Sequence, residues 1–172
     1  MKTRIMVAVV LCLITVAAFG QSNPKLKELD AFAGTWQCTG TAFASPMGPE
    51  HPTSATVHGA WILGGAWMQI QYTEAKSPKN AHPYDVRMLM SYDAEPKALV
   101  SGSVDNMGGY ATAQSPGWVK DTMTFSGPTH AGGATTNSRD IFTRVSKNEM
   151  RHEAEMEMKG KWVKLDQETC KK

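Results

Sequence analysis

The residue types that could carry chemistry in this sequence begin with one histidine in an alternating stretch. Residues 151–158 read RHEAEMEM, with charged side chains at the odd positions and His152, an alanine and two methionines at the even positions. Successive side chains of a β-strand point to opposite faces, so the pattern predicts a strand with one charged face in water and one buried face. His152 then points into the interior, where its imidazole can orient the polar group of a ligand.

Other short runs show the same alternation, and their apolar faces are rich in methionine. Methionine is flexible and polarizable, so it lines adaptable pockets but also fills irregular cores. Two interpretations therefore stay open: a pocket for a small, mostly apolar molecule, or a packed interior with a structural or partner-binding role. The residues predicted to line the pocket are Trp36, Met68, Tyr72, Met88, Met90, Tyr92, His152 and Met156.

Thioethers and imidazoles also suit copper and zinc, which gives a second hypothesis. Met-x-Met occurs at 88–90 and at 156–158. His51, His82 and His130 lie in three long predicted loops, SPMGPEHP, SPKNAHP and GPTHAGG, that are expected at one rim. Exposed loop histidines without a shared geometry are the simpler interpretation, so these three are weak candidates for metal ligands.

The sequence carries no catalytic signature. It has no Gly-x-Ser-x-Gly nucleophile motif, no P-loop and no dinucleotide-binding fingerprint. These observations predict a binding protein rather than an enzyme, and the prediction requires no cofactor.

The N-terminal residues have the composition of a secretory signal. The basic start MKTR precedes an apolar run at 5–19, and small residues lie before a cleavage position after residue 20. The run is short for a membrane span and no second one follows, so we expect a secreted or periplasmic protein without stable membrane insertion. Removal of the signal peptide at 1–20 leaves one domain over 21–172.

The charge of the remaining chain is balanced. The whole sequence has 18 basic and 16 acidic residues, and the leader carries two of the basic ones and none of the acidic ones. This balance provides no basic surface for nucleic acid, so no nucleic-acid partner is expected.

The elements that position these residues are short β-type runs separated by turn residues. A short helix is predicted at 24–32, because proline suits its first turn and glycine its end. The steady succession of strands without crossover helices predicts an all-β fold, an antiparallel up-and-down barrel, with a sandwich as the alternative. The ten predicted strands span 35–43, 53–62, 66–75, 84–93, 97–104, 109–115, 118–126, 134–146, 149–158 and 161–169.

Successive connections in such a barrel alternate between its two ends. The long connections at 44–52, 76–83 and 127–133 share one end, which is the predicted entrance for a ligand. The connections at the opposite end are short, and the helix enters there, so that end is expected to be closed.

Two cysteines remain after the leader is removed, Cys38 and Cys170, and in an oxidising compartment such a pair indicates one disulfide. The bond would join the first strand to the last. However, Cys38 shares the parity of the inward-facing Trp36, whereas Cys170 shares the parity of the outward-facing Lys164. A bulge must therefore intervene, or Cys170 must lie beyond the strand.

A resemblance rests on the helix followed by Ala33-Gly34-Thr35-Trp36 and on three longer segments, WILGGAWMQIQYTEA, MSYDAEPKALVSGSVDNMGGYATAQSPGWVKDTMTFSG and RDIFTRVSKNEMRHEAEMEMKGKWVKLD. Together they resemble the calycin superfamily of lipocalin-like barrels, and in particular a family of exported bacterial domains of unknown function, distantly similar to nitrobindin-like barrels. The resemblance implies a lipocalin-like barrel. It does not imply haem binding, because the last predicted strand, KWVKLDQETC, lacks the histidine that holds haem in nitrobindin-like barrels.

Overall fold

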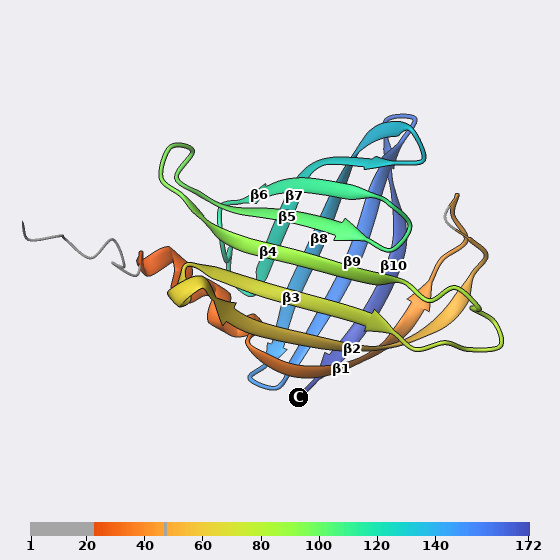
Figure 1. Ribbon diagram of the computed structural model, residues 1–172, viewed down its shortest axis with the longest axis horizontal. Coiled ribbons are helices and arrows are strands. Elements are labelled where there is room, and N and C mark those ends of the chain that lie inside the picture. The colour runs from red at the N-terminus through yellow and green to blue at the C-terminus, as the bar shows by residue number, and fades with distance from the viewer. Residues whose placement is uncertain (1–22, 47) are drawn as a thin grey trace, which may run out of the picture.

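The computed structural model describes residues 23–46 and 48–172, so the predicted signal peptide lies outside the described residues. The elements in chain order are η1 (Pro24–Phe32), β1 (Gly34–Ala42), β2 (His51–Ile62), η2 (Leu63–Gly65), β3 (Trp67–Glu74), β4 (Asp85–Asp93), β5 (Ala98–Asp105), β6 (Tyr110–Ser115), β7 (Thr122–Ala131), β8 (Ala134–Ser146), β9 (Glu149–Met158) and β10 (Lys161–Lys171). Each strand pairs antiparallel with its neighbours in sequence, and β1 pairs with β10 to close a ten-stranded barrel (Figure 1). The predicted all-β, up-and-down barrel with a short N-terminal helix is confirmed.

The N-terminal helix η1 is a 3-10 helix. Its apolar residues Leu26, Leu29 and Phe32 recur every three positions, which places them on one stripe of a helix with three residues per turn. Leu29 and Phe32 are buried, and η1 lies at the end of the barrel opposite the long loops (Figure 1). No helix among the described residues is long and apolar enough to cross a membrane.

The structure corrects the prediction for the seventh strand. The strand predicted at 118–126 runs over Thr122–Ala131, and the loop predicted at 127–133 is a tight hairpin. Its two-residue turn is Gly-Gly, with positive φ at both glycines, as hairpin turns of this length favour. Because the strands extend to this turn, His130 lies on β7 opposite Thr135 rather than in a loop. All other predicted strand boundaries lie within two residues of the observed ones.

The end closed by η1 holds an apolar core. Phe32 lies 6.0 Å from the Trp118 ring and 4.9 Å from the Phe142 ring. The Trp36 indole donates a hydrogen bond to the Phe32 carbonyl at 3.2 Å. A Cβ atom added at Gly59 would lie 2.1 Å from that same oxygen, so only glycine lets β2 approach the end of η1. The buried residues of the apolar core are Leu29, Phe32, Trp36, Cys38, Ala55, Met68, Met90, Leu99, Met123, Phe125, Met150 and Cys170.

The seam between β1 and β10 carries the predicted disulfide. Cys38 and Cys170 are register partners on these strands, and their sulfur atoms are bonded at 2.00 Å. The pairing of β10 with β9 shifts register between Lys164 and Asp166, and this bulge reverses the alternation of side chains beyond it. The bulge resolves the parity conflict in the sequence, because it turns Asp166, Glu168 and Cys170 toward the interior.

Candidate functional site

His152 lies on β9 with its ring between two carboxylates from the neighbouring strands. Its Nε2 atom is 3.1 Å from Oδ1 of Asp140 on β8, and its Nδ1 atom is 3.3 Å from Oδ1 of Asp166 on β10. The imidazole also packs against the Phe142 ring, with 4.8 Å between the ring centres. Each ring nitrogen therefore faces its own carboxylate, and three strands fix the orientation of the imidazole.

The two carboxylates keep His152 protonated. Burial opposes the charged form of the imidazole, but the negative charges of Asp166 and Asp140 and their hydrogen bonds raise the pKa of His152 well above its usual value. The arrangement therefore favours an imidazolium that lies between two carboxyl groups.

A third inward carboxyl group, that of Glu168, lies opposite His152 in the register of β9 and β10. It is buried, and it accepts a hydrogen bond at 2.9 Å from the hydroxyl of Tyr72 on β3, across the interior of the barrel. Burial raises the pKa of Glu168, and burial followed by the charge of Glu168 raises the pKa of Tyr72 above its usual range. The hydroxyl group of Tyr72 therefore keeps its proton and can donate a hydrogen bond. The carboxyl group of Glu168 holds its proton more tightly than an exposed carboxyl group does.

Tyr84 adds a second phenol from the segment just before β4. Its hydroxyl donates to Oδ2 of Asp105 at 3.2 Å, and its ring centre lies 6.2 Å from that of Tyr72. Burial, and then the charge of Asp105, raises the pKa of Tyr84 above its usual range. The inward-facing group that we call the polar cluster consists of Tyr72, Tyr84, Asp140, His152, Asp166 and Glu168.

Solvent reaches the polar cluster inside the barrel. The side chains of His152, Asp140 and Asp166 point inward, yet 19%, 30% and 29% of their surfaces stay accessible. Inward side chains can be accessible only where the interior has room for water. Small residues occupy the positions next to Asp140 and Asp166 in the strand register and leave this room, namely Ala42 and Ala154.

Glu74, the last residue of β3, fixes the loop at 75–84 at the open end. Its buried carboxylate accepts hydrogen bonds from the Asn80 side-chain amide at 2.8 Å and from the Tyr84 backbone amide at 2.9 Å. Its other oxygen lies 3.1 Å from Nε2 of His51 at the start of β2. This network joins the loop to β2 and gives the approach to Tyr84 a defined shape.

The residues predicted to line one pocket lie in two different environments. Tyr72 and His152 belong to the polar cluster. Met156 lies further along β9, opposite Ser138 of β8. The other five are buried in the apolar core or pack against it, namely Trp36, Met68, Met88, Met90 and Tyr92.

The three histidines predicted at the rim do not form a ligand group in the described part of the chain. His51 contacts Glu74, His82 lies in the loop at 75–84, and His130 stacks on Tyr110 with 4.4 Å between ring centres. Among the described residues, one group of three potential ligands is close enough to share an ion, and two of its members are joined in the disulfide. That group is Cys38, Glu168 and Cys170.

Sequence reasoning missed four residues of the polar cluster. Alternation counted from the outward Lys164 places Asp166 and Glu168 outside, and the bulge in β10 reverses this placement. The parity conflict between Cys38 and Cys170 allows for a bulge in the last strand, but it does not give the position of that bulge. Tyr84 could have been found, because it shares the parity of Met88 and Met90, which were expected to face inward. Asp140 could have been found, because it shares the parity of the apolar Phe142.

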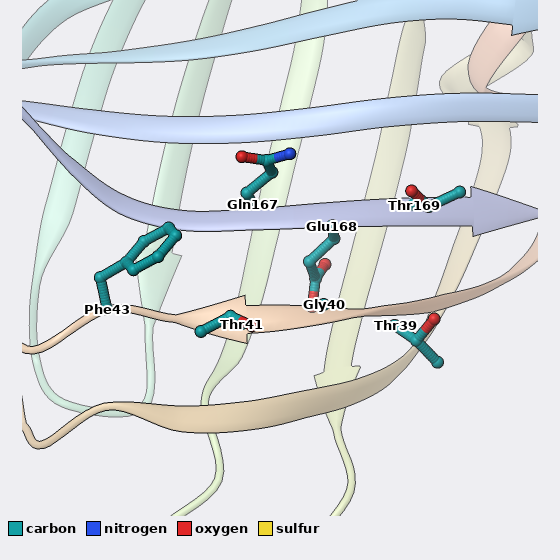
Figure 2. A pocket seen from close by; sticks show the side chains of 7 residues that line it. All are labelled: Thr39, Gly40, Thr41, Phe43, Gln167, Glu168 and Thr169. Atoms are coloured by element: carbon teal, nitrogen blue, oxygen red, sulfur yellow. The ribbon is translucent and has the colours of Figure 1, made fainter.

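Two hollows lie on the outer side of the barrel. The first, of about 310 Å³, follows the seam between β1 and β10 (Figure 2). Its lining consists of Thr39, Gly40, Thr41, Phe43, Gln167, Glu168 and Thr169. The second, of about 640 Å³, is largely apolar and lies over the outer face of β3 to β6. Its larger side chains are Trp67, Gln69, Arg87, Leu89, Val100, Val104 and Tyr110.

The class of protein is a closed ten-stranded antiparallel barrel with a polar, solvent-reached interior. Residues 21–171 match the family described as "Protein of unknown function (DUF1579)", and the chain belongs to this family. Among solved structures, the barrel is similar to the crystal structure of Rv2717c from M. tuberculosis, with a TM-score of 0.62 and 10% sequence identity. The similarity covers 87% of this chain and 98% of that chain, and at this identity it shows the fold alone. No curated protein matches the chain.

Proposed function

We propose that this protein is a binding module that holds a small molecule in the open half of its barrel. One observation carries the proposal: the polar cluster points into the interior and still has access to solvent, whereas the apolar core is packed. The ligand enters at the end opposite η1, between the connections at 43–50, 75–84 and 106–109.

The lining favours a ligand with an apolar body and a cationic or hydrogen-bond-donating head. Both ring nitrogens of His152 are already engaged, whereas ionised carboxylates have several acceptor positions each. An anionic head would meet Asp140 and Asp166, which repel it. The phenol faces of Tyr72 and Tyr84 suit an ammonium group. The sequence predicts a mostly apolar ligand. The lining adds to this prediction a head group that is positively charged or donates hydrogen bonds.

We also propose that the chain is exported and that the mature protein is one domain. The family match begins at residue 21, directly after the predicted signal peptide. The Cys38–Cys170 disulfide suits an oxidising compartment, secreted or periplasmic. The resemblance to lipocalin-like barrels supports an interior ligand site in an exported protein.

The first test compares native and denaturing mass spectra of untagged protein from its own host. We expect an excess mass in the native spectrum that is lost on denaturation, and its size separates an organic molecule from the metal ion of the second hypothesis. Equal masses would favour the packed, structural or partner-binding alternative. The denatured mass also reports whether the signal peptide has been removed.

The second test titrates three probes that share a phenyl body: 2-phenylethylamine, 2-phenylethanol and 3-phenylpropanoate. Calorimetry should show the tightest binding for the amine, and Asp166→Asn should weaken it about tenfold, the loss expected for one charged contact. Glu157→Gln removes a charge from the outward face of β9 and serves as the matched control. Equal or tighter binding of the anionic probe would contradict the proposed chemistry of the head group.

A further inference from the structure

The disulfide at the barrel seam has a carboxyl group beside it. An oxygen of Glu168 and the sulfur atoms of Cys38 and Cys170 all lie within 4.8 Å of one another. All three residues are buried, with 3%, 1% and 9% of their surfaces accessible. Among the described residues, no other carboxylate or imidazole forms such a group with the two sulfurs. A proton source is therefore built next to a bond whose reduction requires protons.

The setting of Glu168 favours its neutral, proton-carrying form. Burial of its carboxyl group raises the pKa of Glu168, and the negative charge of Asp166 on β10 acts in the same direction. The positive charge of His152 on β9 and the hydrogen bond from Tyr72 on β3 oppose this shift, but burial outweighs them. The register neighbours from β1 and β2, Gly40 and Thr53, carry no charge. The carboxyl group thus keeps a proton at pH values where an exposed glutamate has lost it.

The seam hollow on the outer side of the barrel includes Glu168 in its lining. Figure 2 shows Glu168 extending from β10 toward Gly40 of β1, at the place where the hollow crosses the two strands. The backbones are close here, because a Cβ atom added at Gly40 would lie 2.0 Å from the Gln167 carbonyl oxygen. Thr39 and Thr169, the neighbours of the cysteines along the two strands, line the same hollow.

We propose that the Cys38–Cys170 disulfide is a reducible latch on the barrel seam, and that Glu168 is the proton donor and acceptor for its opening and closing. The co-reactant is a protein or small-molecule dithiol. This inference does not rest on the proposed ligand binding, because it uses the seam rather than the open interior.

The exchange balances in two steps. A thiolate of the dithiol attacks Sγ of Cys170, the less buried of the two residues. The S–S bond breaks, and the Cys38 thiolate leaves and takes the proton of Glu168. The second thiol of the reductant then attacks the mixed disulfide, which releases Cys170 and forms the oxidised co-reactant. The proton of that thiol goes to the Cys170 thiolate, and Glu168 recovers its own proton from solvent. The two cysteines gain two electrons and two protons in total.

Opening the latch removes the covalent link between strands that are 132 residues apart in sequence. Loss of a cross-link over a loop of this length costs up to about 5 kcal/mol of stability by its effect on chain entropy. The hydrogen bonds of β1 with β10 remain, so the reduced barrel is closed but weaker at this seam.

The test measures the rate of reduction by dithiothreitol in the native full chain, quenched by alkylation and read as added mass. Glu168→Gln should slow reduction about tenfold or more, within the range of general acid catalysis. The difference should be largest at acidic pH and fade as pH rises through the raised pKa of Glu168, because the carboxylate has no proton to give. Glu153→Gln is the matched control: it removes a β9 carboxylate that pairs with Lys164 and lies outside the sulfur group, and the expected change is below about twofold.

Two results would overturn the proposal. One is equal reduction rates for the parent and Glu168→Gln at every pH. The other is reduction of the parent only at its rate of global unfolding, measured separately by denaturant dilution, since that rate would mean that the native seam never opens to a thiol.

Discussion

The two ends of this barrel are built from the same ten strands but differ in the side chains that face the interior. At the η1 end, large apolar side chains such as Leu99, Met123 and Phe125 are fully buried. In the open half, small residues next to the polar cluster leave space, and charged side chains keep contact with solvent. The difference shows that within one closed sheet a packed apolar core in one half can stabilise the fold, while the other half holds accessible polar groups.

The largest expected effect is the difference in free energy of unfolding between a substitution in the apolar core and one in the polar cluster. Phe125→Ala should lower the free energy of unfolding by about 3–5 kcal/mol, because it leaves a cavity in the packed core. Tyr72→Phe, which removes one hydroxyl from the polar cluster, should cost only about 1 kcal/mol. Denaturant titration of both variants measures the contrast. Equal losses would mean that the apolar core does not dominate stability.

The second prediction concerns the fit of η1 on the barrel. Gly59→Ala should cost about 1–3 kcal/mol, because the new methyl group collides with the carbonyl of Phe32 and displaces the helix. Gly102→Ala is the matched control: a Cβ atom there meets nothing within 4 Å, and we expect a change below about 0.5 kcal/mol. Trypsin cleavage at Lys25 and Lys27 should accelerate in the first variant alone, and unchanged cleavage would show that η1 does not depend on this contact.

The third prediction concerns the electrostatic interactions of His152 in the polar cluster. Because the folded-state pKa of His152 is raised, its contribution to stability is fully present below its unfolded pKa of about 6.5 and is lost as pH rises through the folded value. His152→Gln should therefore cost about 1–3 kcal/mol in mildly acidic buffer and progressively less in alkaline buffer.

Unfolding curves over a pH series check this prediction, with His58→Gln as the control. His58 lies on the outward face of β2 and contacts only the Thr35 hydroxyl among the polar groups described for it. A cost for His152→Gln that does not change with pH would show that the imidazole acts by packing against Phe142 rather than by its charge.

Most of the fold could be predicted from alternation and turn chemistry. The strands at 134–146 and 149–158 have the predicted bounds. In the second of them, charged side chains alternate without interruption with His152 and apolar side chains. The disulfide was also predictable, since only two cysteines follow the predicted signal peptide. The seventh strand was misplaced because Gly127 and Pro128 resemble a break, although β7 continues through both to a Gly-Gly turn.

The site was less predictable than the fold. His152 was found because its neighbours alternate cleanly. Asp166 and Glu168 were missed because a single extra residue in β10 changes which face they occupy, and that change depends on the pairing with β9 rather than on local sequence. A side chain's environment in a barrel is set by register, which involves strands distant in the chain.

The pairing of β1 with β10 also has a consequence for how the chain reaches its native state. Every other strand pair joins neighbours in sequence, whereas this pair must bring together two segments from opposite ends of the chain. Contacts between such distant segments are slow to form, so we expect closure of the seam to come late in folding. Until then β1 and β10 are unpaired edges that can add strands from other molecules. The unclosed barrel is therefore the species most prone to aggregate, and conditions that speed closure should raise the yield of folded protein.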